Sequence, residues 1–298
     1  MELITSVEEK AVANLVENSL DEQLISLWLH GRSPCTIDYY RRSAHRFLLF
    51  VGKPLKEVKL LDVQEYDTHL VDRQLANSTR ATILRALKSL FTFAQKLGYL
   101  QYNTGAPLRT PKAHDALNER ILSEAEVIMM IHLETNIRNK VIMRLLYACG
   151  GRVSETLCSL KWKDLVDRDN QQGQITLFGK GSKTRTVLIP TSVYAEVLAL
   201  RGQAGLNDLI FGLSRSQIHR IIKAAAIRAN VRTFQNAKGK IDSKVSAHWF
   251  RHAHATHALE RGAPISLVQA TLGHSSIAMT GRYLHARPTE SSAKYLAL

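Results

Sequence analysis

The sequence predicts a mainly α-helical protein that contains a small β-hairpin and is divided into two domains. Apolar residues recur at spacings of three and four over most of the 298-residue chain, which is the period of a helix. Two short β-branched or apolar segments, 174–178 and 186–189, interrupt this period on either side of a glycine-containing turn. The length allows two domains, each of which can bury its own core.

Residues 12–103 predict a helical N-terminal domain, for which four helices are the most economical interpretation. Ser33-Pro34 and Asn77-Ser78-Thr79 are suited to the starts of helices, where side-chain oxygens cap free backbone N–H groups. Gly98 is suited to the end of the last long helix.

Residues 104–119 predict the linker between the domains, because glycine and prolines break the helical period without starting a new one. We assign residues 120–298 to the C-terminal domain. This domain opens with Ser123, which is followed three residues later by Glu126 in a capping-box pattern. An apolar helix is expected at 141–149.

The remaining C-terminal elements are expected to be one hairpin and further helices. The hairpin would join 174–178 to 186–189 through a basic turn at 179–184, and the polar segment 233–244 is interpreted as a loop. The last predicted helices are 247–261, 264–272 and 276–285.

The charge of the chain favours a polyanionic partner, nucleic acid before a membrane surface. There are 40 Lys and Arg residues against 26 Asp and Glu residues, a formal charge of +14. Residues 106–298 carry 27 basic and 14 acidic side chains, so this part is expected to meet phosphates most heavily. Basic residues of the N-terminal helices could equally form a solvated face or contact phosphates: Arg41, Arg42, Arg46, Arg80, Arg85 and Lys88.

The cysteines and the hydropathy of the chain indicate a cytoplasmic protein. Cys35, Cys149 and Cys158 have no C-x-x-C spacing, which argues against a disulfide framework and a zinc site. No stretch of about 18 apolar residues and no export signal is present, so no membrane contact is expected. With the basic charge, this predicts a location at the nucleoid.

Residues that can bind and attack a phosphodiester gather toward the end of the chain. His248 and Arg251 have the i, i+3 spacing that places both on one face of a helix. His274 lies at a predicted helix end, and the hydroxyl of Tyr283 could attack phosphorus. With Arg152 upstream, two arginines could bind the non-bridging oxygens without any metal. Each residue alone is a weak signal.

Together these segments resemble the catalytic motifs of the tyrosine recombinases in the phage integrase family, with a layout closest to the Xer-like bacterial members. The family carries an arginine motif, a lysine hairpin, an H-x-x-R-H-x-x-A-T-H motif, an L-G-H motif and a tyrosine nine residues later. This chain has Cys149-Gly-Gly-Arg152-Val-Ser-Glu155, Gly179-Lys180-Gly-Ser-Lys183-Thr-Arg185, His248-Trp-Phe-Arg251-His-Ala-His-Ala-Thr-His257, Leu272-Gly-His274 and Tyr283. The resemblance implies a helical core-binding domain, matched more loosely around Thr36-x-x-x-Tyr40, and an α+β catalytic domain.

The resemblance implies roles for the basic residues of these motifs. Arg152 and Arg251 would bind the scissile phosphate, where negative charge grows in the transition state. Lys180 would protonate the departing 5′ oxygen, although a simple phosphate contact is the alternative. Lys183 is the second candidate for this acid, and Arg185 would bind the DNA backbone.

The resemblance also assigns the remaining site residues. His248 would help to remove the proton of Tyr283, His274 would hydrogen-bond a phosphate oxygen, and Tyr283 would form a 3′-phosphotyrosyl link. Glu155 would orient Arg152, unless it forms a surface ion pair. Tyr295 is the second candidate nucleophile.

The implied partners are double-stranded DNA with an inverted-repeat core site and further copies of the same chain. One protomer would cut one strand, so exchange between two duplexes would need four copies, and the tail 284–298 could dock on a neighbour or pack within its own subunit. No cofactor or ATP is expected, because the phosphotyrosyl ester stores the energy of the cleaved bond. His252, His254 and His257 are assigned to helix packing or DNA contact, since no metal-ligand pattern such as H-E-x-x-H surrounds them.

Two alternatives share part of this pattern. A type IB topoisomerase uses the same attack but rejoins the same duplex, and a catalytically silent protein would only bind its DNA sequence. One departure from the family pattern is Gly151, which replaces a larger apolar residue and is expected to loosen the packing near Arg152. Trp249 and Phe250 are bulkier than is common at their positions.

Overall fold

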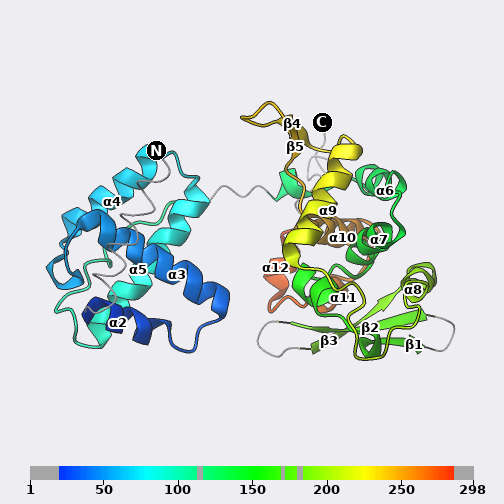
Figure 1. The fold of residues 1–298 in the computed structure, drawn as a ribbon, viewed down its shortest axis with the longest axis horizontal. Coiled ribbons are helices and arrows are strands. Elements are labelled where there is room, and N and C mark those ends of the chain that lie inside the picture. The colour runs from blue at the N-terminus through cyan, green and yellow to red at the C-terminus, as the bar shows by residue number, and fades with distance from the viewer. Residues whose placement is uncertain (1–19, 113–116, 169–171, 180–183, 285–298) are drawn as a thin grey trace, which may run out of the picture. The chain divides into compact units, whose positions relative to one another are not determined.

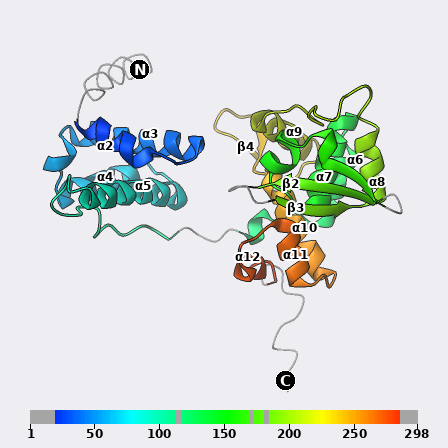
Figure 2. The same cartoon turned by 90° about the horizontal axis from the view of Figure 1, so that it is seen from below.

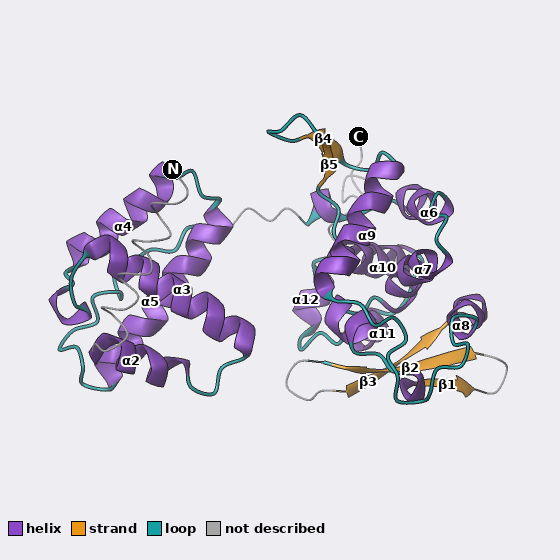
Figure 3. Cartoon of the chain, viewed as in Figure 1, coloured by secondary structure: helices purple, strands orange, loops and turns teal. Residues whose placement is uncertain are grey.

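The computed structural model describes residues 20–112, 117–168, 172–179 and 184–284. The chain divides into two compact units, Met1–Asp115 and Ala116–Leu298. Helices dominate both units, and all of the strands that are described belong to the second (Figures 1 and 3). The predicted mainly helical fold with a small sheet is confirmed. None of the helices in the described ranges is both long and apolar enough to span a membrane.

Four α-helices make up the described part of the first unit, as the sequence predicts. They are α2 (Leu20–Leu29), α3 (Pro34–Val51), α4 (Leu60–Asp72) and α5 (Asn77–Lys96), with the 3₁₀ turn η1 (Leu55–Glu57) before α4. Their apolar faces meet around Phe47 and Phe91, whose rings contact each other edge to face at 5.8 Å. Buried Asp21 joins the ends of the helices, because it accepts hydrogen bonds from the Leu55 N–H (2.8 Å) and the Tyr99 hydroxyl (2.6 Å).

The helix ends of this unit agree with the sequence prediction at one start and differ at another. Ser33 caps α3 by accepting from the Thr36 N–H at 3.4 Å, and Pro34 occupies the first turn. At α5 the predicted caps are wrong, because the helix already begins at Asn77 and no side chain caps it. Gly98 follows the end of α5 with a φ of +73°, a conformation that favours glycine.

The second unit has a helical body and two small antiparallel sheets. Its helices are α6 (Glu124–His132), α7 (Ile137–Cys149), α8 (Thr191–Leu198), α9 (Arg215–Arg228), α10 (Ala247–Glu260), α11 (Ile265–Leu272) and α12 (Ile277–Gly281). Short helical turns are η2 (Asn118–Arg120), η3 (Ser154–Cys158, a π-type turn) and η4 (Trp162–Asp164). The capping box at α6 is confirmed, since the Ser123 hydroxyl accepts from the Glu126 N–H and the Glu126 carboxylate accepts from the Ser123 N–H.

The larger sheet has the strand order β1 (Leu165–Arg168), β2 (Gln172–Phe178) and β3 (Thr184–Ile189). β2 and β3 form the predicted hairpin, in which Gly173 pairs with Ile189 and Phe178 pairs with Thr184. Alternate side chains of β2 and β3 are buried in the core of the unit, as the period of a strand requires. The sequence does not predict β1, because its four residues, Leu165-Val-Asp-Arg168, are too few to show an alternation of apolar and polar side chains.

The smaller sheet corrects the sequence prediction for 233–244. This segment is a second hairpin, in which β4 (Thr233–Gln235) pairs with β5 (Ile241–Ser243). Its turn is stabilised by the Asn236 side chain, whose oxygen accepts from the N–H groups of Lys238 and Lys240. Strands of three residues are too short to show a period, so the sequence of this segment predicts a loop.

α7 and α10 form the centre of the second unit. α10 packs against both α7 and α11 (Figure 2). Phe250 of α10 is fully buried in this core, which stabilises the fold by about 1.5–3 kcal/mol. A bulky aromatic residue in the first turn of α10 therefore fixes the helix that also carries His248 and Arg251.

Candidate active site

Arg251 joins three parts of the second unit at one point. Its side chain is buried in α10, where Nη1 donates to the Gly150 carbonyl and Nη2 donates to the Leu272 carbonyl, both at 2.8 Å. These carbonyls lie at the ends of α7 and α11, whose last C=O groups have no partner within the helix. Burial, and then the nearby charge of Arg152, lower the pKa of Arg251 to about 10. The guanidinium therefore stays charged at neutral pH.

Two adjacent glycines leave room at the end of α7, Gly150 for α10 and Gly151 for η3. Gly150 ends α7 with a φ of +56°, and a Cβ there would lie 2.6 Å from the His254 ring. A Cβ on Gly151 would lie 1.9 Å from the hydroxyl oxygen of buried Thr156. The expectation of looser packing at Gly151 is therefore wrong, because Thr156 fills the space that a larger residue would occupy.

Arg152, Glu155 and Arg185 form two linked ion pairs beside Arg251, with the carboxylate of Glu155 between the two guanidinium groups. Glu155 is only 5% exposed, and its two oxygens lie 2.7 Å from Arg152 Nη1 and 2.8 Å from Arg185 Nη2. Burial opposes ionisation of Glu155, but the hydrogen bonds from Arg152 and Arg185 outweigh it, so that the pKa lies below its usual range. The Arg152 side chain is 40% exposed, so this end of the linked ion pairs faces solvent. The π-type turn η3 bends the backbone here so that Glu155 reaches back to Arg152.

Arg185 is the buried end of these linked ion pairs. Its Nε donates to the Thr271 carbonyl at 2.9 Å, and its side chain is only 12% exposed. β3 is thereby tied to the end of α11. The predicted contact of Arg185 with DNA stays a prediction. In the observed contacts Arg185 binds the Glu155 carboxylate and holds it in place.

His274 follows α11 and is oriented by a second hydrogen bond. Its Nδ1 lies 2.9 Å from the hydroxyl of buried Thr280, which leaves Nε2 as the nitrogen for a substrate. Gly273 makes the turn out of α11 with a φ of +66°. Burial, followed by the charges of Arg251 and other site arginines, lowers the pKa of His274 to about 4. The imidazole is therefore neutral near pH 7.

Tyr283 follows the short helix α12 and points its hydroxyl at α10. The side chain is 7% exposed, and its hydroxyl lies 2.8 Å from His252 Nδ1. The ring of Tyr283 is parallel to that of His274 at 6.2 Å, and His248 contacts the His252 ring edge to face at 4.6 Å. Burial raises the pKa of Tyr283, although Arg251 lowers it in part.

His252 is a site residue for which the sequence predicts another role. The sequence predicts helix packing or DNA contact for it, as it does for His254 and His257. The i, i+4 spacing from His248 was the available signal, because it places His252 on the same face of the helix. That this face meets Tyr283 depends on the turn of the chain after α12, which no local pattern specifies.

The other two histidines of α10 do pack between helices, as predicted. His254 Nδ1 donates to the Tyr147 carbonyl at 2.8 Å, and His257 Nδ1 lies 2.8 Å from the Tyr147 hydroxyl. Both contacts fasten α10 to α7. Within the described ranges, no three His, Cys, Asp or Glu side chains are grouped so that they could hold a metal ion.

An open basic cavity of about 690 Å³ lies next to these residues. It is lined by His248 and His252, by Arg120 of η2, and by Lys244 and Phe234 of the second hairpin among others. Segment 233–244, for which the sequence predicts a loop, thus borders the site. Lys180, Lys183 and Tyr295 of the predicted site lie outside the described residues.

The predicted DNA contacts of the first unit have different surroundings. Arg41 pairs with Glu22 at 3.3 Å, and Arg80 pairs with Asp67 at 2.8 Å. Lys88 donates to the carbonyls of Ala106 (3.2 Å) and Leu108 (2.7 Å). Arg42 pairs with Asp38 on the exposed face of α3. In the part of the chain that the structure describes, Arg46 and Arg85 have neither an ion pair nor a side-chain hydrogen bond.

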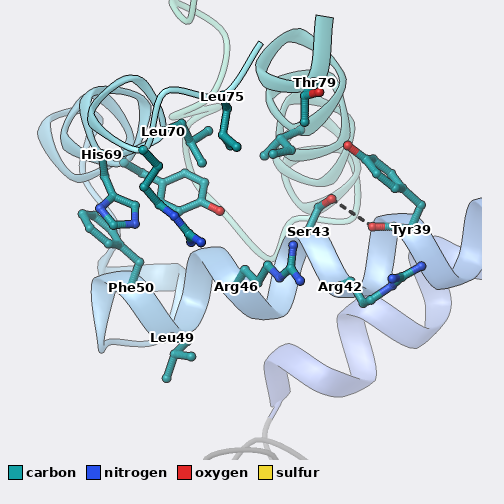
Figure 4. Close-up of a pocket in the computed structure, with 13 residues that line it drawn as sticks. Tyr39, Arg42, Ser43, Arg46, Leu49, Phe50, His69, Leu70, Leu75 and Thr79 are labelled. Atoms are coloured by element: carbon teal, nitrogen blue, oxygen red, sulfur yellow. Dashed lines mark hydrogen bonds between the residues drawn. The ribbon is translucent and has the colours of Figure 1, made fainter. Parts of the chain in front are cut away.

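A cavity of about 430 Å³ in the first unit is lined by three arginines. Arg42 and Arg46 of α3 lie on its lower side in Figure 4, and Arg73 after α4 also lines it. Aromatic side chains, including Phe50 and Tyr39, form part of the wall. A hollow with several guanidinium groups and aromatic walls is suited to a phosphate-bearing ligand.

Both units of the chain are similar to known proteins. Residues 119–290 match the phage integrase family, and residues 20–97 match the phage integrase N-terminal SAM-like domain. The tyrosine recombinase XerD of Shewanella oneidensis is 32% identical over 290 residues, covering 89% of this chain and 91% of that protein. The tyrosine recombinase XerC of Xylella fastidiosa is 31% identical, with 86% and 87% covered.

Solved structures share the fold at lower sequence identity. The XerH recombinase in a pre-cleavage complex with difH matches with a TM-score of 0.69 at 20% identity, covering 93% of this chain and 85% of that one. Lambda integrase residues 75–356, a dimer bound to a core site, match with a TM-score of 0.70 at 19% identity, with 91% and 96% covered. The chain belongs to the phage integrase family and is an Xer-like tyrosine recombinase.

Proposed function

We propose that this site-specific recombinase cleaves each DNA strand by attack of Tyr283 on the scissile phosphate and rejoins it to a new partner strand. The observation that carries the proposal is the convergence of Arg152, Arg251, His274 and Tyr283 from separate segments of the second unit. The Arg251 hydrogen bonds to Gly150 and Leu272 support this, because they bring the segments together.

Arg152, Arg251 and His274 would bind the non-bridging oxygens of the phosphate. Glu155 holds Arg152 through Nη1, so the other guanidinium nitrogens are available to substrate. His274 would offer Nε2, because Thr280 occupies Nδ1. Fixed donors that are already in place stabilise a five-coordinate transition state more than they stabilise the substrate.

Tyr283 would form the covalent intermediate. Its oxygen would bond to phosphorus as the bond to the 5′ oxygen breaks, which leaves a 3′-phosphotyrosyl link and a free 5′ hydroxyl. Lys180 would supply the proton to the departing oxygen, with Lys183 as the alternative acid. Attack by the 5′ hydroxyl of another strand reverses these steps, so no external energy source is needed.

The substrate would be double-stranded DNA with an inverted-repeat core site, bound by several copies of the enzyme. Related proteins support this: XerH was solved bound to difH, and lambda integrase was solved as a tetramer on a Holliday junction. In our proposal residues 12–103 form the core-binding domain and residues 120–298 the catalytic domain, joined by the linker 104–119. Exchange of the tail 284–298 between copies remains a proposal, because residues 285–298 lie outside the described ranges.

Strand exchange is favoured over the two alternatives. The relatives with 31% and 32% identity are tyrosine recombinases, and the groups needed for cleavage are present in the sequence. Supercoil relaxation without recombinant products would instead indicate a type IB topoisomerase, and specific binding without covalent chemistry would indicate a silent DNA-binding protein.

Covalent trapping tests the proposed nucleophile. The full-length protein is incubated with DNA of its own replicon that carries a nicked suicide site, then denatured and examined for a protein–DNA adduct. We expect an adduct with the wild type and none with Tyr283→Phe. Tyr194→Phe is the matched control, since Tyr194 has the same exposed fraction of 7% but lies in the core behind β2. An adduct that survives in Tyr283→Phe would contradict the assignment.

A further inference from the structure

The nucleophile proposed above already has a hydrogen-bond partner in the site. The Tyr283 hydroxyl lies 2.8 Å from Nδ1 of His252, a residue 31 positions earlier in the chain. His248 makes no hydrogen bond to Tyr283 in the described structure, and its ring instead contacts the edge of the His252 ring. The imidazole placed to receive the tyrosine proton is therefore that of His252.

We propose that His252 is the catalytic base of the cleavage step, the role that the sequence pattern assigned to His248. This inference rests on the proposed attack by Tyr283. The tyrosine O–H bond breaks as its oxygen bonds to phosphorus, and the proton moves to His252 Nδ1. The P–O5′ bond breaks at the same time, and the departing oxygen takes a proton from the general acid. In rejoining, the imidazolium of His252 returns its proton to the tyrosine oxygen.

The groups that face His252 keep it neutral before substrate binds. They come from three elements: His248 and Arg251 on α10, Arg120 in η2, and Arg282 with Tyr283 after α12. Burial is the largest cause, and with these neighbours it lowers the pKa of His252 to about 3. A neutral imidazole can offer a lone pair to the tyrosine O–H.

Binding of DNA would make His252 a stronger base. The arginines that disfavour an imidazolium are the same groups that would bind phosphates, and each bound phosphate offsets their charge. The pKa of His252 should therefore rise in the DNA complex. Burial raises the pKa of Tyr283, and the charge of Arg251 offsets only part of this effect. The hydroxyl therefore keeps its proton until a base takes it.

His248 would then carry the proton onward. It is exposed and borders the open basic cavity, while its ring lies 4.6 Å from that of His252. A histidine at this edge can exchange protons with solvent and can contact DNA. His248 would act through His252 and not on the tyrosine itself.

Single-turnover cleavage of the suicide site tests the assignment. His252→Asn keeps a hydrogen-bond acceptor close to the position of Nδ1 but removes the basic nitrogen, and His252→Gln places the amide one atom farther along as a second variant. We expect both to cut at least about 100-fold more slowly, within the range of general base catalysis. In the wild type the rate should fall as the pH drops through the pKa of His252, and this acidic limb should be absent in both variants.

A substrate with sulfur in place of the bridging 5′ oxygen separates the base from the acid. Sulfur leaves without protonation, so a defect in the general acid is relieved and a defect in the base is not. We expect His252→Asn to keep its full loss of rate on this substrate. Relief of the loss would overturn the inference, because it would place His252 on the side of the leaving group.

Controls distinguish the failure of this inference from the failure of the proposed function. His132→Asn removes an exposed imidazole at the end of α6 and should cut at the wild-type rate. A His252→Asn protein that cuts at the wild-type rate or faster, with an unchanged pH profile, would overturn the base while leaving Tyr283 as nucleophile. A wild-type protein that binds DNA but forms no adduct would instead refute the proposed function.

Discussion

Glu155 binds two arginines that face opposite ways. Arg152 reaches toward solvent, whereas Arg185 is directed into the fold and tied to the Thr271 carbonyl. A carboxylate with both oxygens engaged cannot rotate without breaking one contact. The position of Arg152, the residue proposed to bind the phosphate, is therefore coupled to the stability of the sheet and of α11.

Glu155→Gln should weaken both the fold and cleavage. The amide keeps the shape but leaves the Arg185 guanidinium buried without its counter-charge, which typically costs about 3–5 kcal/mol. Urea unfolding measures this loss, and adduct formation should slow because Arg152 loses its orientation. Glu196→Gln is the matched control, because Glu196 pairs with Arg144 at a partly exposed site, where loss should cost at most about 1 kcal/mol.

The pH dependence of the same variant gives a second check. The pKa of Glu155 is lowered from 4.5, so its stabilisation is fully present above about pH 4.5 and is lost as the pH falls through the folded pKa. The difference in unfolding free energy between wild type and Glu155→Gln should accordingly be constant near neutral pH and shrink at acid pH. A difference that grows on acidification would contradict the ion pair.

The identities of the proposed site residues could be predicted from the sequence more readily than the contacts between them. Arg152, Arg251 and His274 stand in linear motifs, which are visible because each motif keeps a fixed spacing. The contact of His252 with Tyr283 depends on how the chain turns after α12, and the engagement of Arg185 with Glu155 depends on where β3 meets η3. Both are products of tertiary packing, which a one-dimensional pattern does not contain.

At the scale of elements, long amphipathic helices were predictable and short strands were not. α3, α5 and α10 have enough residues for a helical period to emerge, and Ser33 and Ser123 mark helix starts through their capping side chains. β1 and the β4–β5 hairpin have three or four residues per strand. Their pairing comes from turns and from neighbouring strands, so local propensity gave no signal.

The junction between α7 and η3 is where backbone space limits the site most tightly. Gly151→Ala should destabilise the protein by about 1–3 kcal/mol, because its Cβ would overlap the Thr156 hydroxyl. Removing that hydroxyl should relieve the overlap, so the double variant Gly151→Ala, Thr156→Ala should lose less stability than the two single losses added together. Thermal unfolding of the four proteins measures this coupling. Strict additivity would contradict the packing described here.

For the whole molecule, the basic charge predicts binding that depends steeply on salt. The formal charge is +14, and each phosphate neutralised by Lys or Arg releases condensed counterions. With six to ten such contacts, affinity should fall roughly 10³- to 10⁵-fold between about 50 and 200 mM salt. The charge makes association fast and largely indifferent to sequence, so specificity must come from contacts to bases and from the deformation of the DNA.

Replacing single arginines should show which part of this charge contacts DNA. Arg46 lines the cavity of the first unit without an ion pair in the described structure, so Arg46→Ala should weaken binding and reduce the slope of log K against log salt by about 0.9. Arg144→Ala removes the same charge from a residue that pairs with Glu196, and should leave the slope unchanged. Equal slopes for Arg46→Ala and the wild type would place the phosphate contacts elsewhere, and a flat salt response of the wild type would contradict electrostatic binding altogether.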